Sequence, residues 1–157
     1  GKMTFETDYE EFNSLDELSS EQRTLISKAI EAAKNAYAPY SGFNVGAAVR
    51  LENGEIITGS NQENAAYPSG LCAERVVLFY AGSKYPGKKI VSIAITAIKG
   101  GKPVGKPVSP CGGCRQVMVE TELRHAHPIE IILHGTEKTR IIHHASDLLP
   151  LPFTLDI

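Results

Sequence analysis

The sequence predicts a single layered α/β domain. Segments with strand character alternate with apolar helical segments along the 157 residues, and residues 89–98 carry isoleucine at both parities. A strand that is apolar at both parities is covered on both faces, which places it in the centre of a sheet between helices. The length suits one domain with a sizeable core.

The N-terminal part is expected to hold an extension followed by one amphipathic helix. Residues 1–18 are acidic, polar and weakly periodic, so we expect an extension that is partly ordered at best, and we interpret its first two residues as a cloning remnant. Ser19 and Gln22 have the spacing of a capping box. Apolar residues then recur at helical spacing until Pro39 ends the helix: Leu25, Ile26, Ala29, Ile30, Ala33 and Tyr37.

The middle of the chain predicts a β-hairpin, a loop and a buried helix. Residues 43–51 have strand character, Asn53-Gly54 is a strong hairpin signal, and residues 55–61 return as a second strand. The stretch from there to Leu71 is expected to be a loop. Residues 72–81 are apolar nearly all round, which predicts a buried helix with Gly82 at its C-terminal cap.

The C-terminal half predicts the central strand, a second buried helix and two short strands. A Gly/Pro/Lys loop over residues 100–109 precedes the helix, which we expect over residues 111–124. The short strands are expected over residues 129–133 and 140–143. Residues 148–153 are apolar and broken by prolines, so we expect another subunit to cover them.

Charge and cysteine usage exclude several classes of protein. The net charge of −2 argues against an obligate nucleic-acid binder, which carries a basic patch. No apolar run approaches the roughly 20 residues that span a bilayer. Three cysteines, two of them separated only by Gly112 and Gly113, do not suit a secreted disulfide framework. We therefore expect a cytoplasmic protein without nucleic-acid or membrane partners.

All three cysteines form one candidate metal site, made of Cys72, Cys111 and Cys114. Both clusters lie where helices are expected to begin, and helix N-termini favour the thiolate form that a metal needs. Three protein ligands leave the fourth tetrahedral position of a zinc ion open to water, which is typical of catalytic sites. Glu74 follows the first ligand by two residues, so its carboxylate is a candidate for proton transfer to a leaving group.

Two arginines flank the candidate site, and other interpretations of the cysteines stay open. Arg75 and Arg115 each lie one residue beyond a site residue, where a hydrogen bond to a thiolate would offset the negative charge of three sulfurs. A Cys-x-x-Cys pair also occurs in redox motifs and in structural zinc sites. A redox disulfide explains neither Cys72 nor Glu74. A structural site needs a fourth ligand, for which the candidates are His125, His127, His134, His143 and His144.

Five segments resemble, in the same order, the cytidine deaminases of the small, homotetrameric, zinc-dependent type. They are Phe43-Asn44-Val45-Gly46-Ala47-Ala48, Asn61-Gln62-Glu63-Asn64-Ala65, Cys72-Ala73-Glu74-Arg75, Ser109-Pro110-Cys111-Gly112-Gly113-Cys114-Arg115-Gln116, and Leu148-Leu149-Pro150 with Phe153. The resemblance implies one catalytic domain over residues 19–157, a three-layer α/β/α fold around a mixed five-stranded sheet. It also implies hydrolytic deamination of free cytidine and 2′-deoxycytidine to uridine and 2′-deoxyuridine plus ammonia, in pyrimidine salvage.

The resemblance further implies roles for the site residues. Cys72, Cys111 and Cys114 would bind one Zn²⁺ per subunit, and Glu74 would be the proton shuttle that also bonds the pyrimidine N3. The residues implied in substrate binding and assembly are Phe43 against the base, Asn61 and Glu63 on the ribose 3′-hydroxyl, the Ala73 backbone on the base edge, the Ser109 carbonyl on the amino group, Phe153 in a neighbouring subunit's site, and Tyr67 between subunits.

The residues themselves support the sugar-binding pair less sharply. Asn61 and Glu63 have the same parity, so an extended segment would point both to one side, where an amide and a carboxylate suit a hydroxyl. Two alternatives stay open. One keeps the chemistry but acts on an aminonucleoside antibiotic or on polynucleotide cytosine, and the other is a structural zinc module that binds proteins.

Overall fold

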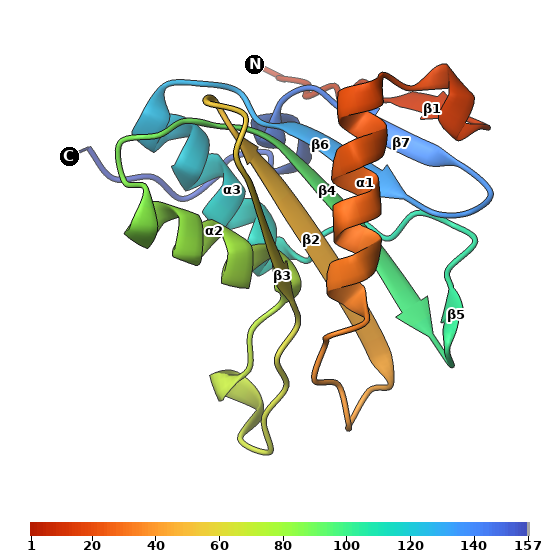
Figure 1. The fold of residues 1–157 in the computed structure, drawn as a ribbon. Coiled ribbons are helices and arrows are strands. Elements are labelled where there is room, and N and C mark those ends of the chain that lie inside the picture. The colour runs from red at the N-terminus through yellow and green to blue at the C-terminus, as the bar shows by residue number, and fades with distance from the viewer. Residues whose placement is uncertain (157) are drawn as a thin grey trace.

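A seven-stranded mixed sheet with helices on both faces forms the body of the molecule (Figure 1). The structure is a computed structural model and describes residues 1–156. The strands are β1 (Glu10–Phe12), β2 (Phe43–Leu51), β3 (Ile56–Ser60), β4 (Ile90–Lys99), β5 (Lys102–Pro103), β6 (Glu130–His134) and β7 (Thr139–Ile142). The helices are α1 (Ser20–Ala33), α2 (Ala73–Lys84) and α3 (Gly112–His125), with 3-10 turns η1 (Leu15–Glu17), η2 (Tyr67–Ser69) and η3 (Ala145–Leu148).

The strand order is β1-β7-β6-β4-β2-β3, and β5 pairs with β4 beyond this path. β4 and β6 are parallel, whereas the other pairs are antiparallel, so the sheet is mixed as expected. The expected number of five strands is wrong, because β1 and β5 add to the five-stranded body. Both additions are short and lie at the periphery, where pairing depends on a few main-chain hydrogen bonds rather than on a hydrophobic pattern.

The three helices divide between the two faces of the sheet, which confirms the three-layer fold (Figure 1). α1 packs on one face with a core that includes Leu25, Ile26 and Ala48. α2 and α3 pack on the other face with the larger core, which includes Val77, Met118 and Ile95. β4 contributes to both cores, with Ile93 and Ile95 on the side of α2 and α3 and Ala94 on the side of α1, so it is covered on both faces as expected, although its buried isoleucines lie on one of them.

Close contact between α1 and β2 depends on a glycine. A Cβ atom at Gly46 would lie 2.0 Å from the carbonyl oxygen of Ala29. A side chain there would therefore push the helix away from the sheet. The segment that follows α1 leads directly into the candidate site, so this contact helps to place it.

Three expectations about the helices are wrong in detail. α1 ends at Ala33, and Tyr37 instead forms a parallel bridge with Gln62. Gly82 lies inside α2 rather than at its cap, because the helix continues to Lys84. α2 and α3 are buried on one side only, and Phe79, Tyr80 and Leu123 are exposed. Apolar composition alone does not reveal that one face of each helix lacks a covering layer within the chain.

The N-terminal extension is attached to the sheet through β1, which pairs with β7 in antiparallel register. Glu11 accepts a 2.8 Å hydrogen bond from Arg140 Nε, and Thr7 donates to the main-chain carbonyl of Asp147. Part of this extension, for which we expect partial order at best, is therefore held in place. The domain boundary at residue 18 stays a prediction. Across residues 1–156, the helices are all too short or too polar to traverse a bilayer.

Candidate functional site

The cysteines meet where two helices begin. Cys72 is the N-cap of α2 and Cys111 is the N-cap of α3, both with extended main-chain angles, while Cys114 lies in the first turn of α3. The Sγ atoms of Cys72 and Cys111 are 3.8 Å apart. All three sulfurs lie within 4.8 Å of one another. The helix starts predicted from the sequence therefore bring the three thiols to one point.

The electrostatics of this cluster suit a cation. The pKa of Cys72 is lowered to about 5, first by its contact with the Cys114 thiol and then by the hydrogen bond from Arg75. The pKa of Cys114 is raised, first by its hydrogen bond with Cys72 and then by burial. One thiolate is thus stabilised at the expense of its neighbour. A divalent cation among the sulfurs removes this conflict, since it stabilises all three as thiolates.

The donor set fits zinc. Tetrahedral zinc with bonds of about 2.3 Å separates its sulfur ligands by roughly 3.8 Å, and this matches the 3.8 Å between Cys72 and Cys111. Within residues 1–156, no histidine or carboxylate completes the cluster as a fourth ligand. The structural zinc module, which needs a closed coordination sphere, therefore finds no support among the described residues.

Arg75 touches the cluster and Arg115 does not. Arg75 Nη2 donates to Cys72 Sγ over 3.4 Å, and this hydrogen bond raises the pKa of the guanidinium further. Arg115 instead donates from Nε to the Pro110 carbonyl over 2.8 Å and from Nη1 to the Leu148 carbonyl over 3.1 Å. It braces the main chain ahead of Cys111, so only Arg75 has the contact with sulfur that the sequence suggested for both.

Glu74 lies in the first turn of α2 with only 5% of its surface exposed. Burial is the main cause of its raised pKa, and the negative charge of Cys72 adds to it. A carboxyl group with a raised pKa binds a proton more readily than an exposed carboxyl group does, which suits a group that takes up and passes on protons during a reaction. Glu74 therefore has the properties of a general acid–base beside the sulfur cluster.

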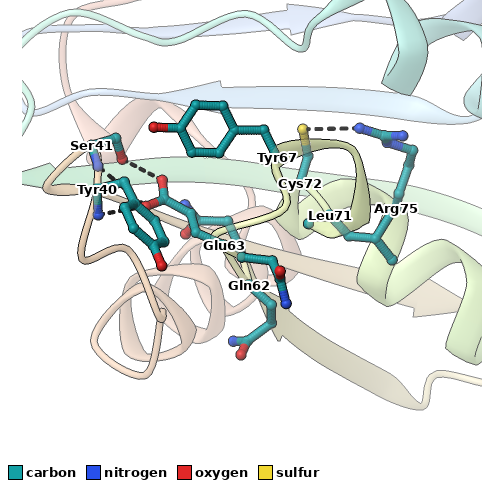
Figure 2. A pocket seen from close by; sticks show the side chains of 11 residues that line it. Tyr40, Ser41, Gln62, Glu63, Tyr67, Leu71, Cys72 and Arg75 are labelled. Carbon is teal, nitrogen blue, oxygen red and sulfur yellow. Dashed lines mark hydrogen bonds between the residues drawn. The ribbon is translucent and has the colours of Figure 1, made fainter.

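A cavity of about 500 Å³ opens next to Cys72. Asn61 and Glu63 line it together with Tyr67, Cys72 and Arg75, and Figure 2 shows Glu63 towards one end and Cys72 with Arg75 towards the other. The cavity therefore extends from Cys72, one thiol of the sulfur cluster, to the two polar residues that were expected to bind a sugar. Its volume suits a small molecule rather than a polymer strand.

The two polar residues are held by the chain segment that precedes and begins β2. Asn61 Nδ2 donates to the Phe43 carbonyl over 2.9 Å, and its Oδ1 accepts from the Val45 N–H over 2.8 Å. Glu63 Oε1 accepts from the main-chain N–H groups of Tyr40 and Ser41, over 3.0 and 3.2 Å. Both side chains thus point to one side, as their shared parity predicts.

The Glu63 carboxylate is further fixed by Ser41, whose Oγ donates to Oε2 over 2.5 Å (Figure 2). This hydrogen bond is the main cause of the lowered pKa of Glu63. Tyr67, from η2, makes an edge contact with Tyr40 at 5.9 Å between ring centroids. The end of the cavity near Glu63 is therefore polar and negatively charged, with two aromatic rings beside it.

The other predicted residues are not part of this cavity's lining. Phe43 is half-buried, and its carbonyl accepts from Asn61, which does line the cavity. Ala73 is buried between Cys72 and Glu74. Ser109, which precedes Pro110, lines a different cavity of about 350 Å³. Phe153 lies beyond η3 with 70% of its surface exposed.

Sequence reasoning missed Ser41 as the partner of Glu63 and Gln116 as the partner of the Phe153 main chain. Ser41 Oγ also accepts from the Phe43 N–H over 3.0 Å, which is the local turn that serine favours. That turn signal after Pro39 was available in the sequence. Gln116 bonds to the main chain of Phe153, which lies 37 residues further along the chain, and no local sequence pattern predicts this contact.

Comparison with known proteins shows that the sequence is similar to cytidine deaminases. Residues 19–127 match the family model described as the cytidine and deoxycytidylate deaminase zinc-binding region. The chain is 46% identical over 101 residues to cytidine deaminase of Halalkalibacterium halodurans, covering 64% of this chain and 71% of that protein. It is 38% identical over 132 residues to cytidine deaminase of Mycobacterium tuberculosis, covering 84% and 89%.

The fold is also similar to that of a cytidine deaminase of known structure. The crystal structure of cytidine deaminase from Burkholderia pseudomallei superposes with a TM-score of 0.70 at 41% identity, covering 83% of this chain and 98% of that one. The sequence match and the fold match therefore involve the same kind of protein.

Proposed function

The chain belongs to the family of cytidine and deoxycytidylate deaminases and is a hydrolytic deaminase, and we propose that its substrates are free cytidine and 2′-deoxycytidine. The products are uridine and 2′-deoxyuridine with ammonia, and the physiological role is pyrimidine salvage. The observation that carries this proposal is the cavity that Cys72, one of three clustered thiols, lines together with the polar pair Asn61 and Glu63.

Cys72, Cys111 and Cys114 bind one zinc ion per subunit in this proposal. When bound, the ion supplies Lewis acidity that makes water a stronger nucleophile towards C4 of the pyrimidine. Arg75 draws negative charge from Cys72 and so limits how far three thiolates weaken that acidity. Arg115 donates to the Pro110 carbonyl and thereby fixes the main chain that leads into Cys111.

Glu74 moves the protons of the reaction. Its raised pKa lets it take a proton from water, deliver it to N3 of the base and pass another to the departing amino group. The main chain next to it completes the recognition of the base: the Ala73 N–H bonds the base edge and the Ser109 carbonyl accepts from the amino group. Phe43 packs against the base.

Asn61 and Glu63 bind the 3′-hydroxyl of the sugar. The carboxylate of Glu63 can accept from a hydroxyl at Oε2, which receives one hydrogen bond, from Ser41 Oγ, whereas Oε1 already accepts from the N–H groups of Tyr40 and Ser41. Its lowered pKa keeps it ionised, as an acceptor only. Both ribonucleosides and 2′-deoxyribonucleosides present this hydroxyl, so the pair accepts either class.

We also infer a homotetramer with shared sites. Phe153 and Leu151 are exposed at the C-terminal end, and Phe79, Tyr80 and Leu123 are exposed on α2 and α3. In an assembly, Phe153 enters a neighbouring subunit's site and Tyr67 lies between subunits. The partners are thus a nucleoside and further copies of the chain, not nucleic acid or membrane, and the cytoplasmic location stays a prediction from cysteine usage.

The test is turnover of cytidine, followed by its change in ultraviolet absorbance, with and without a zinc chelator. We expect conversion of cytidine and 2′-deoxycytidine and loss of activity with the chelator. Single-stranded oligonucleotides and an aminonucleoside antibiotic are assayed in parallel. Faster turnover of either would reject the free pyrimidine nucleoside as the substrate, and retention of full activity in metal-free protein would reject the zinc site.

A further inference from the structure

The C-terminal segment after η3 bends sharply and ends in an exposed aromatic ring. Leu151 has a φ of +50°, the left-handed conformation that non-glycine residues rarely adopt. Pro150 and Pro152 on either side limit the alternatives of the main chain. This bent segment needs an external hold, because a left-handed leucine costs free energy and is itself 82% exposed.

Gln116 on α3 supplies that hold. Its Nε2 donates to the Phe153 carbonyl over 2.7 Å, and its Oε1 accepts from the Phe153 N–H over 3.3 Å. The amide thus pairs with both main-chain groups of one residue, as a neighbouring strand would. Among residues 1–156, these two hydrogen bonds are the only ones that join residues 150–156 to the rest of the chain.

The segment ahead of the bend is fixed from the same helix. Arg115 donates to the Leu148 carbonyl over 3.1 Å, and Glu122 accepts from the N–H groups of Ala145 and Ser146 over 2.7 and 3.0 Å. Side chains of α3 therefore bind the main chain of residues 145–148 and, through Gln116, bind it a second time at Phe153. Without the second attachment, the tail would pivot about Leu149 and Pro150.

We propose that Gln116 is a positioning residue for deamination, which acts by fixing the main chain of Phe153 so that the exposed ring has one direction. This inference rests on the proposed role of Phe153 in a neighbouring subunit's site. A ring that is already oriented loses less conformational entropy on meeting substrate, so Gln116 acts on KM more than on kcat.

The kinetic test is a double-mutant cycle with Gln116→Met and Phe153→Leu. Methionine keeps the length of the side chain and removes both polar atoms. We expect KM for cytidine to rise about ten-fold in Gln116→Met, close to the loss of one or two ordinary hydrogen bonds, with kcat changed less than about two-fold. The double variant should be no worse than Phe153→Leu alone. Additive effects would overturn the proposal, because the residues would then act separately.

A second test reads the position of the tail without activity. The chain contains no tryptophan, so Phe153→Trp introduces a single indole fluorophore. Its anisotropy should fall, and its quenching by acrylamide should rise, when Gln116→Met is added. Unchanged anisotropy would overturn the attachment even in a fully active enzyme, and the attachment can be read in this way even if cytidine is not the substrate.

The matched control is Gln22→Met on α1. Gln22 likewise accepts from a main-chain N–H, that of Ser19 over 3.0 Å, but lies away from the site. This control should lose some stability and keep both the KM and the kcat of the parent enzyme. Gln116→Met should also retain the parent's zinc content, since loss of zinc would overturn the proposal by placing the effect at Cys114.

Discussion

Replacement of Asn61 by alanine should cost stability and activity together. The side chain is 9% exposed and closes two hydrogen bonds to β2, with the Phe43 carbonyl at 2.9 Å and the Val45 N–H at 2.8 Å. Alanine leaves both main-chain groups without these partners. Each buried main-chain group left without a hydrogen-bond partner costs about 1–2 kcal/mol, so the free energy of unfolding should fall by about 2–4 kcal/mol.

Urea unfolding measures this loss, and Glu63→Ala is the comparison. Glu63 is more accessible than Asn61 and contacts only the exposed turn at Tyr40 and Ser41, so its loss should change the unfolding free energy by less than about 1 kcal/mol. Both variants should raise KM for cytidine. Measurements use one protein concentration, since assembly adds to apparent stability. A change below about 0.5 kcal/mol for Asn61→Ala would refute the structural role derived from its two hydrogen bonds.

Three further predictions concern the site and the core. Glu74→Gln should bind zinc and fold like the parent while its kcat falls about 10²–10⁴-fold or more, and near-full activity would contradict its role as proton shuttle. Arg75→Leu removes the hydrogen bond to Cys72 Sγ and should weaken zinc binding about 10–100-fold in competition with a chromophoric chelator; an unchanged affinity would show that the contact does not matter. Burial lowers the pKa of His134 below its usual 6.5. The unfolded chain then binds the proton more readily, so stability should fall as the pH drops below about 6.5, and His134→Gln should flatten that part of the curve in urea unfolding at several pH values. The same slope in both proteins would exclude His134 as its source.

Much of the body of the fold could be predicted from local pattern. Residues 43–51 form β2 with the predicted bounds, and the capping box at Ser19 begins α1 as expected. These features depend on neighbours in sequence. The strand β5 is also local, since Pro103 pairs with Ile98 across Gly100 and Gly101, but the Gly/Pro/Lys composition of this stretch was interpreted only as a loop. The α2 carbonyl of Gly82 accepts from Arg124 of α3, a contact from a distant part of the chain that no local pattern shows.

The site divides in the same way. The sulfur cluster was predictable because helix N-termini collect Cys72 and Cys114 from two separate motifs, and Glu74 follows from its place in one of them. The side-chain contacts that hold the site together could not be predicted from the sequence. Ser41 with Glu63 spans 22 residues and Gln116 with Phe153 spans 37. A side chain bonded to a distant main chain leaves no periodic signal.

β1 closes one border of the sheet with three residues, of which Glu10 and Glu11 are acidic. The outward main-chain groups of β7 would otherwise be a template for a strand of another molecule. A border strand this short offers few main-chain groups for pairing with a second copy. It thus discourages fibrillar growth from that side. An affinity tag is best fused ahead of Thr7, where it leaves this protection intact.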